Sequence, residues 1–206
     1  MTAIRKGRWQ TLQHLAILLT ETGQIEHLRD LIFQNSKSFT GEQLRTIANG
    51  LFPMHPAAAA LQSVLGELPD MLKDGPLGQP GQKEFWPAAE ILLRAAIQAG
   101  DRYSSFRLGL LLTQDGSRAA EAGAAYRDAI AAGVTPAYSA LGNLLTHNAA
   151  RLSEAEAVYR EGVKANDKGS FAALILILAR TPGRQEDLNE IATLAVQRGI
   201  VKLPPS

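Results

Sequence analysis

Apolar side chains along the second half of the chain recur every three or four residues, which is the spacing that places them on one face of a helix. Between Ser153 and Ala165, small and apolar residues form one stripe and charged residues occupy the other faces. In the segment from Tyr138 to Thr146, Leu141 and Leu145 share a face. No segment alternates apolar and polar residues with an enrichment in β-branched side chains, so the pattern predicts an all-α fold.

The pattern repeats at a fixed step of about 33 residues, and each unit contains two helical segments. Residues suited to the left-handed end of a helix fall in register at Gly100, Gly133, Asn166 and Gly199. Further positions coincide at the same step: Ile97, Ile130, Val163 and Val196; Arg94, Arg127 and Arg160; Leu108, Leu141 and Leu174; Tyr126 and Tyr159; Gly109 and Gly142; Arg118, Arg151 and Arg184. An alanine-rich composition does not explain the Arg, Tyr and Gly coincidences, so we predict stacked helix pairs.

Two signals predict where helices begin in the best-defined unit. Pro136 suits a first helical turn, where its missing N–H is not needed. Ser153 followed by Glu156 predicts a capping box at the start of the second helix.

The N-terminal third fits the repeat less closely. His14 to Leu31 predicts two helices with Gly23 at their turn, and Gly41 to Leu51 and Pro56 to Leu68 predict two more. Leu65-Gly66 is a candidate first-helix motif for the unit whose second helix runs from Pro87 to Ala99. The intervening stretch Asp74 to Gln82 is rich in Gly and Pro, and it is either a connector or a flap anchored by Phe85 and Trp86.

We therefore divide the chain into four parts. Residues 1–72 form N-terminal helical hairpins, 73–85 form an insertion or linker, 86–200 carry the regular repeat, and 201–206 are a tail.

One unit resembles a known family. Tyr138-x-x-Leu141-Gly142-x-x-Leu145, followed by Ala155-x-x-x-Tyr159-x-x-Gly162, is similar to the tetratricopeptide repeat. The resemblance implies a right-handed α-solenoid of stacked antiparallel helix pairs, a superhelix of about 10–11 helices. Its small residues would admit close helix approach and its tyrosines would fill the holes between helices.

The match departs from the family in two ways. The step is about 33 residues instead of the usual 34 or so, and no proline closes the second helix. Sel1-like repeats therefore remain close relatives. Ankyrin repeats also step by about 33, and Thr135-Pro136 resembles their turn, but the equivalent Arg102-Tyr103 and Lys168-Gly169 do not.

Composition and motifs exclude several classes of function. The formal net charge is +1, which predicts neither a nucleic-acid nor a membrane partner. The chain has no cysteine and no phosphate-binding or catalytic motif, and its histidines, His14, His27, His55 and His147, are widely separated. We therefore expect no metal, no cofactor and no enzyme activity. With no long apolar segment, we expect a soluble, cytoplasmic protein.

The family resemblance also indicates a binding surface. Ligands of tetratricopeptide arrays contact mainly the concave face formed by the first helices, so the resemblance implies a protein–protein interaction scaffold that holds a peptide or helix of a partner protein there. The implied lining is Tyr103, Phe106, Arg107, Leu110, Ser139, Asn143, Thr146, Ala172 and Leu176. Because this lining is mostly small, apolar or uncharged, we expect an apolar or mixed ligand whose binding depends weakly on salt.

Two alternatives remain. One is an enzyme or an essential enzyme subunit built on an α-solenoid, which would need a deep pocket with several titratable groups. The other is a structural array that self-associates, as a homodimer for example, through an uncapped repeat end. The run from Phe171 to Ala179 is apolar all round, and we expect the last helix, Glu186 to Arg198, to cover it.

Overall fold

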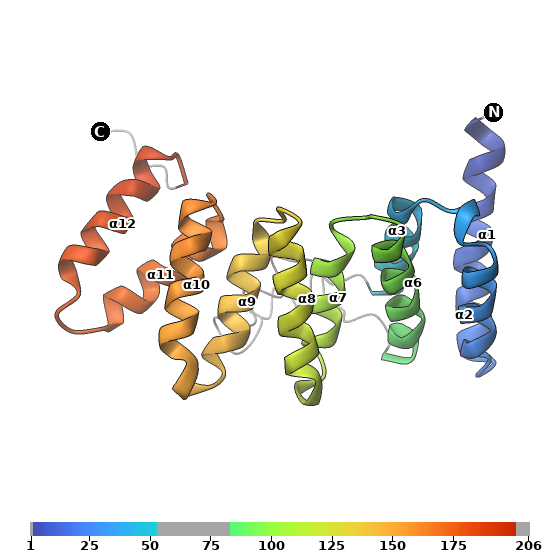
Figure 1. Cartoon of the computed structure of the whole chain (residues 1–206), viewed down its shortest axis with the longest axis horizontal. Coiled ribbons are helices and arrows are strands. Elements are labelled where there is room, and N and C mark those ends of the chain that lie inside the picture. The colour runs from blue at the N-terminus through green and yellow to red at the C-terminus, as the bar shows by residue number, and fades with distance from the viewer. Residues whose placement is uncertain (1, 53–82, 201–206) are drawn as a thin grey trace, which may run out of the picture. The chain divides into compact units, whose positions relative to one another are not determined.

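The computed structural model of the chain describes residues 2–52 and 83–200, without the side chains of 2–10 and of Ser36. These residues form α-helices joined by turns and short 3₁₀ helices and contain no β-strand, which confirms the predicted all-α class (Figure 1). They divide into two compact units between Ala132 and Gly133. The predicted helix Pro56 to Leu68, the motif Leu65-Gly66 and the Gly- and Pro-rich stretch lie outside the described residues.

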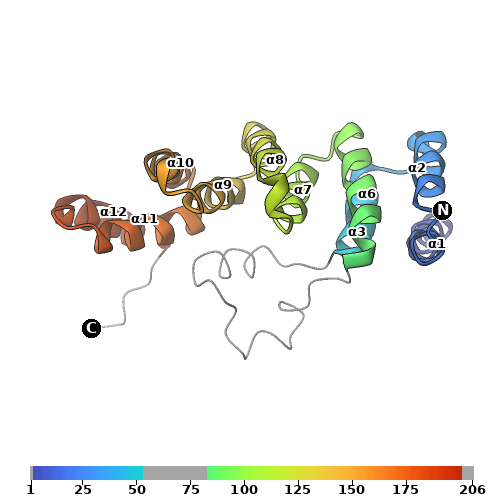
Figure 2. The ribbon, with the colours of Figure 1, turned by 90° about the horizontal axis from the view of Figure 1, so that it is seen from below.

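The described part of the first unit consists of three helix pairs. Its elements are α1 (Thr2–Glu21), α2 (Ile25–Gln34), η1 (Ser36–Ser38), α3 (Gly41–Leu51), η2 (Lys83–Phe85), α6 (Trp86–Gln98), α7 (Ser104–Leu112), η3 (Gly116–Arg118) and α8 (Ala119–Ala131). Helix α1 packs with α2, α3 with α6, and α7 with α8. Within this unit α2 and α8 lie on one side of their partners α1 and α7 (Figure 2).

Helix α6 has a described partner that the sequence analysis did not predict. Among the described helices, α6 packs most extensively on α3, although the whole segment 52–85 separates the two along the chain. The candidate Leu65-Gly66 lies outside the described residues, so its pairing with α6 stays a prediction. Trp86, an anchor in the flap alternative, begins α6, and its ring packs edge-to-face on Phe52, with 6.0 Å between ring centroids.

The second unit contains two further helix pairs in its described residues. They are α9 (Pro136–Thr146) with α10 (Leu152–Lys164), joined through η4 (Ala149–Arg151), and α11 (Lys168–Arg180) with α12 (Gln185–Gln197). Helix α12 covers only part of the apolar run in α11. Phe171, Ala173, Leu174 and Leu178 are buried, whereas Ala172 and Ala179 remain exposed.

A glycine of the first helix lies beneath a tyrosine of the second helix in one pair of each unit. A Cβ atom at Gly109 would lie 2.5 Å from Cε1 of Tyr126, and a Cβ atom at Gly142 would overlap the Tyr159 ring. Both rings are fully buried, and both hydroxyls are satisfied. Tyr126 shares a 2.9 Å hydrogen bond with Thr113, and Tyr159 donates a 2.6 Å bond to Asn143. The predicted role of small residues in close helix approach is confirmed at these two pairs.

Left-handed residues end the second helices, as predicted. The φ angles of Gly100, Gly133, Asn166 and Gly199 are +83°, +79°, +62° and +67°. Most L side chains avoid this region, whereas glycine and asparagine tolerate it. Gly23, the predicted turn residue between α1 and α2, has a φ of +70°.

The predicted capping box at Ser153 is wrong. Helix α10 begins at Leu152, and its N-cap, Arg151, makes no side-chain cap bond. Ser153 is therefore already inside the helix. Glu156 does not return to the helix start but pairs with Arg160 and Arg184. These arginines compete successfully for the carboxylate because ion-paired hydrogen bonds are stronger than neutral ones.

A buried aspartate ties the start of α11 to α9. Asp167 is 6% exposed and accepts hydrogen bonds from the backbone N–H of Ser170 at 3.0 Å and from its hydroxyl at 2.6 Å. It also accepts one from the backbone N–H of Ser139 in α9 at 3.0 Å. Asp101, which stands two repeats earlier, accepts from the Ser104 hydroxyl and from Arg45 of α3. In both units one carboxylate thus bonds the start of a first helix and the first helix of the preceding pair.

Replacing Gly142 with alanine should destabilise the protein even though alanine is the better helix former. In an open helix this change would add about 1 kcal/mol of stability. Here the methyl group meets the Tyr159 ring, so we expect a net loss of about 1–3 kcal/mol in the free energy of unfolding, measured by urea denaturation. Gly116→Ala is the control, because nothing lies within 4 Å of a Cβ atom there. Equal stability of the two variants would contradict the close-approach interpretation.

Replacing Asp167 with alanine should cost about 2–4 kcal/mol, because it removes a helix cap and leaves the buried Ser139 N–H without its acceptor. Asp115→Ala is the matched control, since Asp115 caps η3 at an exposed site and should cost less than about 1 kcal/mol. Thermal unfolding of both variants by circular dichroism checks the difference. A loss at Asp167 no larger than at Asp115 would rule out the link to α9.

Candidate functional site

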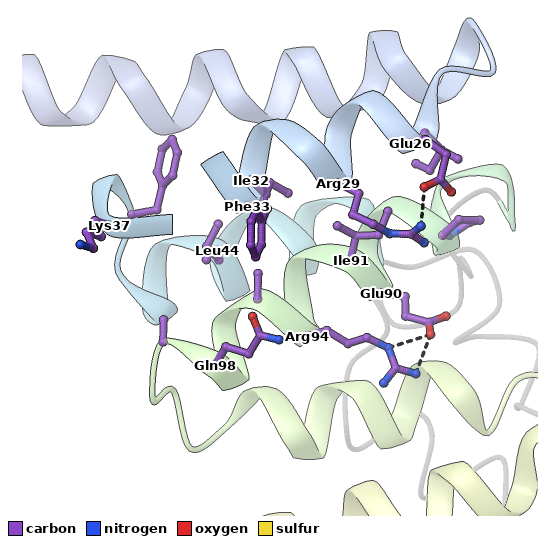
Figure 3. A pocket seen from close by; sticks show the side chains of 15 residues that line it. Glu26, Arg29, Ile32, Phe33, Lys37, Leu44, Glu90, Ile91, Arg94 and Gln98 are labelled. Carbon is purple, nitrogen blue, oxygen red and sulfur yellow. Dashed lines mark hydrogen bonds and ion pairs between the residues drawn. The ribbon is translucent and has the colours of Figure 1, made fainter. Parts of the chain in front are cut away.

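An open cleft of about 750 Å³ lies between α2 and α6 in the first unit (Figure 3). Each helix contributes one face, and α3 and the segment after α2 contribute the remainder. The lining residues are Ile25, Glu26, Arg29, Ile32, Phe33, Lys37, Phe39, Leu44, Pro87, Glu90, Ile91, Arg94, Ala95, Gln98 and Ala99. The volume is that of a small-molecule or side-chain site.

The middle of the cleft is apolar. Leu44 of α3 and Ile32 of α2 are buried at its floor, and Ile91 and Ala95 of α6 are half-buried on its wall. Phe33 differs from these residues, because 79% of its surface is exposed. An exposed phenylalanine beside a hollow with an apolar floor is typical of a surface that another molecule covers.

Most charged groups of the cleft pair with one another. Glu26 pairs with Arg29, and Glu90 pairs with Arg94 at 2.8 Å. Glu90 also accepts two hydrogen bonds, at 2.7 and 2.8 Å, from Arg118 of η3. Among the described residues Lys37 has no ion-pair partner, and it lies at the opposite end of the cleft from Glu26 and Glu90 (Figure 3).

The arginines hold Glu90 in its ionised form. Hydrogen bonds from Arg118 and Arg94 lower the pKa of Glu90 from its ordinary 4.5 to about 2, against the opposing effect of burial. A general acid at neutral pH needs a raised pKa. The lowered value therefore makes Glu90 a structural anion and not a proton donor.

The ion cluster around Glu90 recurs two repeats later, in the second unit. Glu90, Arg94, Arg118 and Glu121 correspond to Glu156, Arg160, Arg184 and Asp187. Arg184 pairs with Glu156 at 2.8 Å, and hydrogen bonds from Arg184 and Arg160 lower the pKa of Glu156. The intermediate repeat has Gly123 at the glutamate position. Sequence reasoning aligned the arginines but missed their carboxylates, because it compared single repeats and not alternate ones.

Four of the residues predicted to line a concave face lie in the first unit. Tyr103 is 42% exposed, and the guanidinium groups of Arg45 and Arg102 lie 5.7 and 5.1 Å from its ring centre. Phe106, Arg107 and Leu110 are buried. Phe106 packs on Tyr126, and Arg107 donates a 2.7 Å hydrogen bond to the carbonyl of Phe52.

The remaining five lie in the second unit. Ser139 and Asn143 are buried, and Asn143 accepts the Tyr159 hydroxyl bond described above. Thr146 and Leu176 are half-buried, and Ala172 is exposed. Solvent therefore reaches Tyr103, Thr146, Ala172 and Leu176 to differing degrees, and the partner-binding role of the nine residues stays a prediction.

Comparison of the chain with protein-family models, with curated proteins and with solved structures gave no match. Within residues 2–52 and 83–200, no helix is both long and apolar enough to cross a membrane. The same part of the chain has no cluster of three side chains of the His, Cys, Asp or Glu type that would hold a metal ion. The repeat assignment thus depends on the residues of this chain alone.

Stability should fall in acid with a contribution from Glu90. Its pKa in the folded chain, about 2, is lower than its ordinary 4.5, so its contribution is complete above about pH 4.5 and is lost as the pH falls towards 2. At pH 7 we expect Glu90→Gln to cost on the order of 1–3 kcal/mol, a range that allows for solvent screening of the arginines.

Urea denaturation at several pH values checks this expectation. The difference between the wild type and Glu90→Gln should shrink between pH 4.5 and about 2. Glu161→Gln is the control, because Glu161 is 57% exposed and its pair with Lys164 should contribute less than about 0.5 kcal/mol. A difference for Glu90 that does not change with pH would contradict the assigned role of its charge.

Proposed function

We propose that this protein is a scaffold that binds a segment of another protein and carries out no chemistry itself. The cleft between α2 and α6 carries the proposal. Its apolar floor and the exposed Phe33 offer a surface to be covered, and its carboxylates are already paired with arginines. Such a lining suits an apolar guest better than a reaction that needs a free acid or base.

The finer part of the proposal is a tetratricopeptide-like array, a right-handed superhelix of stacked repeats with a concave binding face. Its support is the recurrence of glycine under tyrosine in α7 with α8 and in α9 with α10, where the family pattern places small and large residues. The left-handed residues at the ends of second helices agree with it. A guest on the concave face would contact the accessible members of the predicted lining, above all Tyr103 and Leu176.

The enzyme alternative receives no support from the cleft. Its titratable groups are two carboxylates, two arginines and a lysine, and it contains no histidine. The carboxylate of Glu90 is fixed in its ionised form. Its pKa is shifted away from neutrality, whereas the pKa of a catalytic acid or base is usually shifted towards it.

The proposal predicts that a displayed library of random peptides contains ligands for the folded chain. We expect dissociation constants of about 1–100 μM and sequences rich in apolar residues. Because the ligand surface holds few free charges, affinity should change less than about threefold between about 50 and 300 mM NaCl. Fluorescence polarisation of the selected peptides measures both quantities. A selection that yields no ligand, or only strongly salt-dependent ones, would overturn the proposed function.

Variants should separate the concave face from other surfaces. Tyr103→Ala and Leu176→Ala remove side chains that solvent reaches, so a loss of binding reports a contact. Phe106→Ala and Asn143→Ala are unsuitable, because they remove buried packing and the acceptor of the Tyr159 hydroxyl. If neither of the first two variants weakens any selected peptide, the guest lies elsewhere on the chain.

A further inference from the structure

We propose that the cleft between α2 and α6 is a docking groove for an amphipathic helix of a partner protein. The partner helix runs antiparallel to α2 and α6, and an acidic residue in its first turn faces Lys37. This inference rests on the proposed scaffold function and deepens it by naming the kind of segment bound, and it places that segment on the second helices α2 and α6 instead of on the predicted concave face of the first helices.

The geometry of the cleft fits one face of a helix. Helices α2 and α6 run in the same direction and face each other along their length (Figure 3). The lining positions of α6 extend from Pro87 to Ala99, about 18 Å of helix or roughly three turns. A volume of about 750 Å³ accommodates a row of large side chains but not the body of a helix. The guest backbone therefore lies above the cleft, with its apolar row pointing in.

The exposed apolar surface identifies what the guest must cover. Phe33 is 79% exposed at the edge of the cleft, beside the buried Ile32 and Leu44. An apolar side chain placed between Phe33 and Ile91 would remove both from water at once. An extended peptide leaves its own backbone groups to be satisfied, and the described residues offer no strand edge that would pair with them. A helix satisfies its own backbone, so it is the guest that this cleft suits.

Charge gives the guest its direction. At one end of the cleft the carboxylates of Glu26 and Glu90 are already paired with arginines. At the other end Lys37 has no ion-pair partner among the described residues, and α2 and α6 reach their C-termini there. Those C-termini carry partial negative charge, which favours the partly positive N-terminus of a guest helix. An acidic residue in the guest's first turn is stabilised both by its own helix and by Lys37.

Three synthetic peptides of about 15 residues, capped and labelled with fluorescein, test the inference. Each carries a row of leucines at three- and four-residue spacing on an Ala and Gln background. The first has Glu in its first turn, the second has Glu in its last turn, and the third has Lys in its first turn. Fluorescence polarisation with the full-length chain measures each affinity.

We expect the first peptide to bind about two- to fivefold more tightly than the third, and Lys37→Gln should reduce this preference to the part that arises from the peptide's own helix. Phe33→Asp should weaken all three peptides about tenfold or more, because it places a charge in the apolar contact. Leu152→Asp is the matched control, since Leu152 is also an exposed large apolar residue, 50% exposed, but lies in the second unit. It should change affinity less than about twofold, and circular dichroism should show that both variants are folded.

The results that would contradict the inference bear on different parts of it: the site, the direction of the guest helix and the identity of the occupant. Peptide binding that survives Phe33→Asp places the ligand outside the cleft and overturns the inference, while the proposed function stands. Equal affinity of the first two peptides overturns the direction. Self-association of the peptide-free chain that Phe33→Asp abolishes, seen by sedimentation velocity, makes a second copy the occupant and also overturns it. No binding of any peptide up to about 1 mM overturns the inference, and the library selection then decides the proposed function independently.

Discussion

The close approach of two helices over a glycine is the constraint on which the central helix pairs, α7 with α8 and α9 with α10, depend. Without a Cβ atom at Gly109 or Gly142, the backbone of the first helix lies directly under the tyrosine of the second. The ring then buries its whole surface and still finds a partner for its hydroxyl, so no buried polar atom opposes the packing at this joint. A methyl group in the same place would separate the helices and expose the ring edge. The spacing of these two pairs is therefore set by one missing side chain in each.

The Asp–Ser caps and the central glutamates of the Glu–Arg clusters recur along the sequence at a longer period than the Gly–Tyr contacts. The Gly–Tyr joints recur in consecutive repeats, whereas the Asp–Ser caps and the Glu–Arg clusters recur in alternate repeats, once in each compact unit. The intermediate positions hold Val134 and Ala137 in place of the cap, and Gly123 in place of the central glutamate. In that repeat Arg151 pairs with Glu154, which stands at the position of Glu121 and Asp187. The central glutamate and the Asp–Ser cap are thus absent from the intermediate repeat and present in the repeats on either side of it.

Local signals predicted the fold well, because they act within a few residues. The helix ends at Gly100 and Asn166 follow from backbone sterics, and Tyr126 over Gly109 follows from side-chain size. The false capping box at Ser153 shows the limit of this reasoning, because a distant arginine took the glutamate that the local motif needed. The pairing of α6 with α3 escaped prediction for a related reason. Loop-closure entropy grows slowly with length, so a long intervening segment does not prevent a good pair from forming.

The candidate site was the least predictable part, because it depends on which faces remain uncovered. Sequence analysis assigned binding to the first helices, yet Phe106, Arg107, Leu110, Ser139 and Asn143 lie in buried contacts. No pattern in α2 and α6 marks a cleft, since both helices carry ordinary amphipathic faces whose apolar residues would suit a core. What distinguishes them is that Phe33 is uncovered while the neighbouring carboxylates are neutralised. A surface whose charges, apart from that of Lys37, are paired with one another has little electrostatic attraction for small ions or polar substrates. The free energy that it offers a ligand is hydrophobic, and a row of apolar side chains on a helix is the guest best able to use it.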